Sequence, residues 1–234
     1  MANPAIVLAI FEFVVLLFAL SLHEAAHGWT AWRLGDPTAR MLGRVTLNPA
    51  KHIDPLGTIL LPVAALFLGL PLIGWAKPTP VTSRNFAHYK RDDMLVTLAG
   101  PASNVLAGIV SLLVLAVISV TSPAGKASVQ SVALQGLSGL NAQLMTISPI
   151  AYPLAEIFYI AMLWNLFLAA FNLLPLPPLD GSHIVRHWLP FKWQATFDRL
   201  GILSIFLMLF LGGRVAMGLI SPVLGFFRVL LLSI

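Results

Sequence analysis

Cysteine is absent from the 234 residues of the sequence. This absence excludes disulfide bonds, thiolate metal ligands and a nucleophilic thiol. Charge is also scarce, because Asp, Glu, Lys and Arg together make up only 10% of the residues, against about a quarter in a soluble globular domain. Any metal site in this chain must therefore be built from histidine and carboxylate side chains.

Hydrophobic residues are abundant, at 58% of the chain, and the mean hydropathy is +0.88. These values predict an α-helical polytopic membrane protein whose surroundings are the lipid bilayer. The formal net charge of +5 does not predict a nucleic-acid partner, because the basic residues are scattered through the loops between apolar runs. Membrane topology explains such a distribution better.

Four apolar runs are long enough to cross a bilayer core, which takes about 20 helical residues. They are Pro4 to Trp32, Met94 to Val120, Pro149 to Leu176 and Leu200 to Ile234. The first is expected to be a retained span, since it lacks the cleavage site of a signal peptide. The last is interrupted by Gly212, Gly213 and Arg214, and it is expected to form two spans.

A fifth apolar run, Leu56 to Ile73, is short and is interrupted by proline and glycine. Basic residues flank it on both sides, and short loops rich in Lys and Arg face the cytoplasm. These residues are Arg33, Arg40, Arg44 and Lys51 before the run and Lys77, Arg84, Lys90 and Arg91 after it. The run is therefore expected to enter the membrane and return on the same side. The expected fold has about five to six transmembrane helices and this re-entrant segment, in the cell membrane with an external N-terminus.

Two short segments beside the re-entrant run, Met41 to Leu47 and Trp75 to Thr82, have the residue pattern of β-strands. Pro78 and Pro80 favour an edge strand, because proline donates no backbone hydrogen bond. A membrane-associated β-hairpin is therefore expected. No stretch outside the apolar runs is long enough for a soluble domain. A single integral-membrane domain is expected over 1–234, with a catalytic core over about 4–190 and C-terminal helices over about 200–234.

His23, Glu24 and His27 form an H-E-x-x-H pattern near the end of the first apolar run. Histidines four residues apart share one face of a helix, so both rings can reach one metal ion, and the glutamate beside the first can act as a general base. The alternative is that these are unrelated polar residues at a helix end. It is disfavoured because an ionisable group inside a membrane costs about 2.5 to 3.5 kcal/mol. The expected orientation places this pair about 10 Å from the cytoplasmic end of the helix, at about 1.5 Å per residue from His27 to Leu34.

A catalytic zinc site usually has three protein ligands and an open position, so the pattern lacks one ligand. Asp180 stands out among the remaining acids because it follows a long apolar run and three prolines that would break the helix. Non-helical backbone near membrane depth is tolerated where it lines a polar cavity. The alternative is that Asp180 only caps a helix that continues through Gly181.

These residues resemble the site-2 protease family of intramembrane zinc metalloproteases. The resemblance rests on H-E-A-A-H from His23, on G-P-A-S-N from Gly100 to Asn104, and on N-L-L-P-L-P-P-L-D-G from Asn172. The segment from Gly74 to Pro78 also looks like the hairpin of this family. Together the similar elements cover roughly residues 10 to 190.

The resemblance implies that His23, His27 and Asp180 bind Zn²⁺ and that Glu24 is the catalytic base. It also implies that Asn104 and Asn172 hydrogen-bond the substrate backbone or the oxyanion, although each amide could instead join two helices. The implied function is a zinc-dependent endopeptidase that cleaves membrane-anchored proteins within or near a transmembrane helix, as in regulated intramembrane proteolysis. The expected partner is a protein with a single transmembrane helix.

Regulation of such an enzyme is expected to come from a membrane partner, from earlier trimming of the substrate, or from gating by its own helices. On the sequence alone, neither the PDZ-like insert nor the nucleotide-sensing domains of several relatives is expected. Two other functions compete with proteolysis. A metal transporter would show polar residues along a pathway and repeated halves, and neither occurs in the sequence. A scaffold that only binds membrane helices would have no use for Glu24.

The remaining histidines near these motifs are expected to be structural. His52 lies in a polar, basic loop. His183 and His187 repeat the i, i+4 spacing, but Arg186 lies between them. Alternatively, the His183 side chain could approach the site and support the metal ligands without binding the metal itself.

Overall fold

The computed structural model describes residues 4–68, 74–137, 140–201, 211 and 213–233. These residues are largely helical, and no β-strand occurs among them. Three of the described helices are long and apolar enough to cross a membrane: α1 (Pro4–Arg33), α4 (Tyr89–Thr121) and α7 (Ala151–Asn172). The expected α-helical membrane protein is thus confirmed. The count of five to six spans is not.

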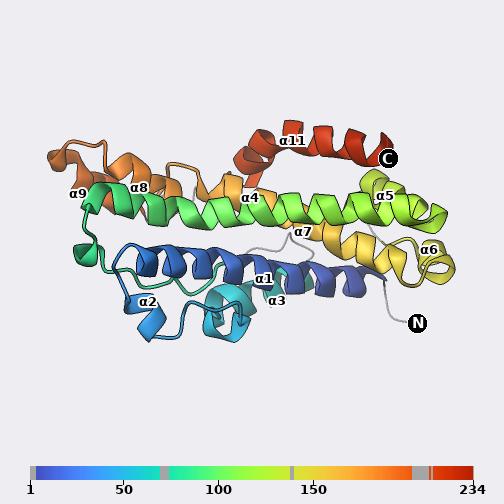
Figure 1. Cartoon of the computed structure of the whole chain (residues 1–234), viewed down its shortest axis with the longest axis horizontal. Helices are drawn as coiled ribbons and strands as arrows, with labels where there is room; N and C mark the ends of the chain where they lie inside the picture. Colours follow the sequence, from blue (N-terminus) through green and yellow to red (C-terminus); the bar gives the residue numbers. More distant parts are fainter. Residues whose placement is uncertain (1–3, 69–73, 138–139, 202–210, 212, 234) are drawn as a thin grey trace.

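The three long helices run side by side and form the body of the molecule (Figure 1). A helix satisfies its own backbone hydrogen bonds, which lipid cannot do, so apolar segments of this length become helices. α4 and α7 approach closely at Gly108, where an added Cβ would lie 3.1 Å from the Leu166 side chain. Leu8 and Val15 of α1 pack with Ile160 of α7. Apolar packing therefore holds the three helices together.

The two ends of this bundle carry different short helices (Figure 1). α5 (Pro123–Gln135) and α6 (Ala142–Ile147) lie at the end where the N-terminus lies. Ser122 and Asn141 begin these helices by accepting hydrogen bonds from backbone N–H groups of the first turn. At the opposite end lie α8 (Asp180–Arg186) and α9 (Phe191–Arg199).

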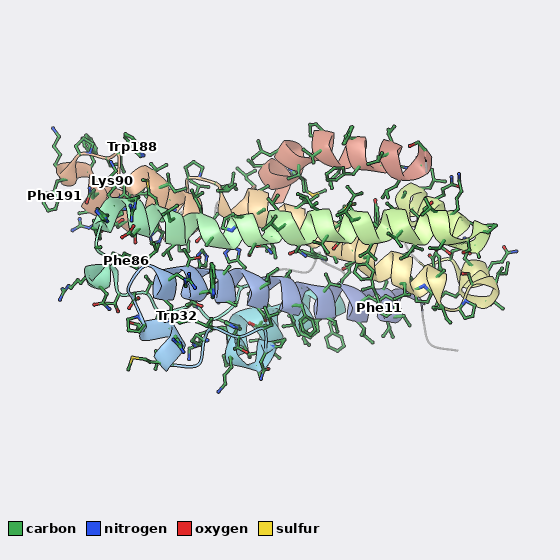
Figure 2. The ribbon with its side chains drawn as sticks, viewed as in Figure 1. Phe11, Trp32, Phe86, Lys90, Trp188 and Phe191 are labelled. Atoms are coloured by element: carbon green, nitrogen blue, oxygen red, sulfur yellow. The ribbon has the colours of Figure 1, made fainter. Side chains whose placement is uncertain are left out.

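Aromatic and basic side chains gather at the α9 end. Figure 2 places Lys90, Trp188 and Phe191 together there. The Lys90 ammonium lies 4.1 Å from the centre of the Trp188 ring, and the Trp188 and Phe191 side chains are exposed. Such residues are enriched where a membrane meets water. This end of the bundle therefore has the character of a membrane interface.

The expected re-entrant run, Leu56 to Ile73, is described only as far as residue 68. It begins with a π-helical turn, η2 (Pro55–Leu60), and continues as α3 (Leu61–Leu68). Asp54 starts the turn by accepting hydrogen bonds from the backbone N–H groups of Leu56 and Gly57. Whether the chain returns to the same side depends on residues 69–73, which lie outside the described residues.

The expected β-hairpin is not confirmed. Met41 to Leu47 leaves the short helix α2 (Thr38–Met41) through turns and bends, and Trp75 to Thr82 has no strand partner among the described residues. Instead, Trp75 and Lys77 donate their backbone N–H groups to the carbonyls of Gly57 and His52, at 3.3 and 2.8 Å. Two prolines in the segment, at positions 78 and 80, have no N–H to offer a ladder. Segment 74–82 is therefore attached to η2 and to the turn η1 (Pro49–Lys51).

Asp36 anchors the far end of segment 74–82. Its side chain is fully buried just after α1. The carboxylate accepts hydrogen bonds from the Thr82 N–H at 2.7 Å, from the Asn85 amide at 2.8 Å and from the Thr38 hydroxyl at 2.5 Å. Thr82 precedes the turn η3 (Ser83–Asn85), which leads into α4. One buried carboxylate thus joins the end of α1 to the start of α4.

The C-terminal run, Leu200 to Ile234, lies partly outside the described residues, so the expected two spans are not tested. Its described part is α11 (Gly213–Ser233). α11 packs against α5 and α7, and Figure 1 shows it on the side of α4 that faces away from α1. The Gln130 amide donates to the Leu232 carbonyl, and the Arg228 guanidinium to the Leu134 carbonyl. This end of the chain is therefore part of the bundle.

Candidate metal centre

His23 and His27 lie on one face of α1, inside the 28-residue apolar stretch Ile6–Arg33. Both side chains are buried. Their ring centres are 4.7 Å apart, and the two Nε2 atoms are 3.1 Å apart. The i, i+4 spacing on a continuous helix therefore brings both nitrogens to one point, as the sequence predicted.

The other nitrogen of each ring is hydrogen-bonded on α4. His27 Nδ1 lies 2.7 Å from the Val96 carbonyl oxygen, and His23 Nδ1 lies 2.6 Å from Asn104 Oδ1. Both partners are oxygen acceptors, so each Nδ1 carries the proton and each Nε2 presents a lone pair. This is the arrangement that a metal-binding histidine needs.

Asp180 reaches the two imidazoles from α8. A Cβ at Gly181 would collide with the carbonyl oxygens of Leu173 and Leu174, so glycine lets the start of α8 fold back tightly against the end of α7. This close turn carries Asp180 to the histidines. Its Oδ2 lies 3.0 Å from His23 Nε2 and 3.4 Å from His27 Nε2.

The three side chains fit a zinc ion. Zinc–ligand bonds of about 2.0 to 2.2 Å in a tetrahedron place ligand atoms about 3.3 to 3.5 Å apart, and the three ligand atoms here are separated by 3.0, 3.1 and 3.4 Å. One atom from each of His23, His27 and Asp180 forms a group that could hold a metal ion. Two imidazoles and one carboxylate leave a fourth position open, as in catalytic zinc sites.

The carboxylate of Asp180 supports the same fit. Its Oδ2 is buried, and no described donor makes a well-aligned hydrogen bond to it. A buried carboxylate oxygen that lacks a donor is well suited to a cation.

Gly100 provides the space for the two rings. A Cβ at this position would lie 2.6 Å from His23 Nε2 and would also collide with His27 Nε2. Gly100 is buried on α4, opposite the H-E-x-x-H pattern. Any larger residue would displace the rings that the metal needs.

Glu24 lies beside the cluster and is held by segment 74–82. The backbone N–H of Thr79 donates to Glu24 Oε2 at 2.6 Å, and the Thr79 hydroxyl donates to the Glu24 carbonyl oxygen at 3.0 Å. These bonds fix the carboxylate on the side of α1 that faces the segment. A carboxylate adjacent to a metal-binding histidine can serve as a general base, the role expected for Glu24.

The two expected substrate asparagines have different surroundings. Asn104 is fully buried, and its amide bonds to His23, to the Ala19 carbonyl and to Asn165. Asn172 is half-buried, and it donates its amide to the Leu168 carbonyl of its own helix. No observation tests a substrate role for either residue, so both roles stay predictions.

The other histidines lie outside the cluster. His52 Nε2 is 2.9 Å from the Thr46 carbonyl oxygen, which agrees with a structural role in the loop. His183 is exposed. His187 Nε2 lies 2.7 Å from Asp93 Oδ2, joining the end of α8 to the start of α4. None of these residues belongs to the metal-binding group found among the described residues.

Three residues that support the site were not predicted from the sequence. Val96 holds the His27 ring and Thr79 holds the Glu24 carboxylate through backbone atoms, so the residue type at these positions gives little sign of the role. Asn165 did carry a usable sign, because it is a third amide within the long apolar runs, seven residues before Asn172. Polar side chains at such depth need a hydrogen-bond partner.

Comparison with known proteins supports the geometry. The sequence model of peptidase family M50, the site-2 protease family, matches residues 11–212. The chain belongs to this family. The resemblance of its motifs to the site-2 proteases is thereby confirmed, and this M50 protein is a zinc metalloprotease.

Curated relatives agree with this assignment. "Putative zinc metalloprotease YwhC" of Bacillus subtilis is 36% identical over 177 residues, which are 76% of this chain and 68% of the relative. "Putative zinc metalloprotease Rip2" of Mycobacterium tuberculosis strain H37Rv is 31% identical over 194 residues, covering 82% of this chain and 62% of the relative. The alignment thus leaves more than a third of Rip2 unmatched. No solved structure gives a significant match to this M50 chain.

Proposed function

We propose that this M50 protein is an intramembrane endopeptidase that cleaves membrane-anchored proteins within or beside a transmembrane helix, as in regulated intramembrane proteolysis. The observation that carries the proposal is the position of the metal-binding group. His23 and His27 lie inside a 28-residue apolar helix, and Asp180 completes the group from α8. A peptide bond that reaches these residues must itself enter the apolar bundle.

The chemistry divides among four side chains. His23, His27 and Asp180 would hold zinc, which supplies a Lewis acid that polarises the scissile carbonyl and lowers the pKa of water toward about 7. Glu24 takes the proton from the attacking water and passes it to the leaving nitrogen. The Thr79 N–H holds the Glu24 side chain in place for this proton transfer.

Segment 74–82 has the properties of a surface on which an unwound substrate could lie. A helical substrate must lose its internal hydrogen bonds before its backbone can be attacked, and pairing with an extended edge can replace them. The N–H groups of Trp75, Lys77 and Thr79 are already bonded within the chain, and the prolines at 78 and 80 have none. The segment would therefore offer the substrate mainly carbonyl acceptors, so the substrate must supply the N–H groups.

The expected topology completes the proposal. The basic loops predict an external N-terminus and an active site near the cytoplasmic face of the cell membrane. Cleavage would then release a cytoplasmic fragment from a substrate with a single transmembrane helix. Control of this step would come from a membrane partner, from earlier trimming of the substrate, or from movement of the helices around the site.

The proposal is tested by reconstitution of the full chain in lipid vesicles. The probes are two fusion proteins with one transmembrane helix each, one with an uninterrupted leucine helix and one with Gly-Pro in the inner half. We expect cleavage near the Gly-Pro pair, because that helix unwinds at lower cost. Cleavage of a soluble unfolded peptide while both membrane probes stay intact would contradict the proposal.

Two variants separate chemistry from binding in this assay. Glu24→Gln keeps the side-chain size and the zinc ligands, so it should retain zinc while the rate falls about 10² to 10⁴-fold. Asn172→Ala should retain zinc and weaken capture of the probe, because an amide that positions backbone contributes to orientation. Cleavage by Glu24→Gln at the wild-type rate would exclude the mechanism. Wild-type capture by Asn172→Ala would exclude the binding role.

A further inference from the structure

A chain of hydrogen bonds runs from a metal-binding histidine across the bundle to α7. His23 Nδ1 lies 2.6 Å from Asn104 Oδ1, Asn104 Nδ2 lies 2.8 Å from Asn165 Oδ1, and Asn165 Nδ2 lies 2.8 Å from the Ala161 carbonyl oxygen. The exposed fractions of His23, Asn104 and Asn165 are 4%, 0% and 5%. All three hydrogen-bonded side chains are therefore shielded from water and lipid.

The direction of these bonds is fixed at the α7 end. A backbone carbonyl can only accept, so the Ala161 oxygen requires the amide nitrogen of Asn165. This leaves Asn165 Oδ1 facing Asn104, which must then offer its own amide nitrogen. The Ala19 carbonyl oxygen on α1, 3.2 Å from Asn104 Nδ2, also requires a donor and so fixes the Asn104 amide in the same orientation.

The consequence reaches the metal site. The Asn104 amide nitrogen donates both of its hydrogen bonds, to Asn165 and to the Ala19 carbonyl. Only its oxygen faces His23, so His23 must carry its proton on Nδ1. The Nε2 lone pair is then free on the side of His27 and Asp180. If the Asn104 amide turned over, it would present a donor to Nδ1, and the proton of a neutral His23 would move to Nε2.

We propose that Asn165 is a positioning residue of the zinc site, which acts through Asn104 to fix the ring orientation and the protonated nitrogen of His23. The proposal rests on the zinc ligands of the proposed function. His27 needs no such relay, because its Nδ1 bonds directly to the Val96 carbonyl. Asn165 therefore supports one of the two imidazoles selectively, which a general packing role would not do.

The same helix provides a matched control. Asn172 also donates its amide to the carbonyl four residues earlier, at 2.9 Å from Leu168, and among the described residues no hydrogen bond joins it to His23, Asn104 or Asn165. Asn165→Leu and Asn172→Leu therefore remove the same local bond. Only the first removes the acceptor for Asn104. An Asp at position 165, in its neutral form, can still donate to Ala161 and accept from Asn104.

The test measures zinc affinity of the purified full chain by competition with a chelator. We expect Asn165→Leu to bind zinc about 10- to 100-fold more weakly, the usual effect of losing a partner of a metal ligand. Asn165→Asp and Asn172→Leu should stay within about threefold of wild type, since the relay is intact in both. If Asn165→Leu does not fold, Asn165→Ser serves instead, because its short hydroxyl cannot reach Asn104.

A second readout follows the proton itself. In the zinc-loaded chain labelled with ¹⁵N-histidine, the ring N–H signals of His23 and His27 report the bonds at Nδ1. Asn165→Leu should shift the His23 signal and speed its exchange with water, while the His27 signal stays unchanged. Equal changes in both signals, or zinc affinity within about twofold of wild type, would overturn the proposal.

The two proposals fail in different ways. If His23→Ala and His27→Ala together leave zinc binding intact, the ligand set of the proposed function is wrong. If that double variant loses zinc while Asn165→Leu and Asn165→Ser keep it, the positioning role alone is wrong.

Discussion

Replacing Gly100 by alanine should weaken zinc binding at the site while leaving the bundle folded. The added Cβ would lie 2.6 Å from His23 Nε2, where ordinary contact begins near 3.4 Å, and it would also collide with His27 Nε2. The His23 ring would have to retreat by about 0.8 Å and the His27 ring by more, although zinc–ligand distances are held to about 0.2 Å. We therefore expect zinc affinity to fall at least about 10- to 100-fold, or about 1.4 to 2.8 kcal/mol.

Gly108→Ala is the matched control, because it lies on the same helix two turns away. Its Cβ would lie 3.1 Å from the end of the Leu166 side chain, which can move. Both substitutions stabilise the helix by up to about 1 kcal/mol, because alanine has a higher helix propensity than glycine. A difference in zinc affinity between the two variants therefore reflects displacement of the histidine rings. Chelator competition gives the zinc affinity, and thermal unfolding with and without chelator shows that each variant folds. Gly100→Ala with zinc affinity within about twofold of the Gly108→Ala value would refute the reasoning.

Three further predictions test the surroundings of the site. Burial raises the pKa of Asp36, but its hydrogen bonds outweigh burial and hold that pKa below its ordinary value, so the carboxylate stabilises the fold above pH 4 and less as the pH falls below it. Asp36→Asn should therefore lower Tm at pH 7, and the gap from wild type should narrow below about pH 4; a gap independent of pH would contradict this. Thr79→Pro removes the N–H that holds Glu24, so kcat should fall about tenfold or more with zinc affinity unchanged; unchanged kcat would exclude the contact. Single cysteines at Lys51 and Arg84 should be labelled from the same face of the membrane, and labelling from opposite faces would refute the re-entrant segment.

The composition and the apolar runs determined the class of this protein and its main helices. Met94 to Val120 lies within α4 and Pro149 to Leu176 overlaps α7, because a long apolar segment has no other way to satisfy its backbone in lipid. α4 starts five residues before its apolar run, at Tyr89, since helix formation continues through polar residues that hydropathy does not count. Residue spacing on a single helix also sufficed to pair His23 with His27.

Tertiary structure decided the rest of the site. Asp180 meets the histidines only because the chain after α7 turns tightly at Gly181, a contact over a long sequence separation that no local pattern encodes. The same holds for segment 74–82, where the strand pattern of Trp75 to Thr82 was outweighed by its prolines and by carbonyl partners on η1 and η2. The bonds from His23 through Asn104 to Asn165 join three helices. Their polarity follows from backbone carbonyls that become neighbours only when α1, α4 and α7 pack.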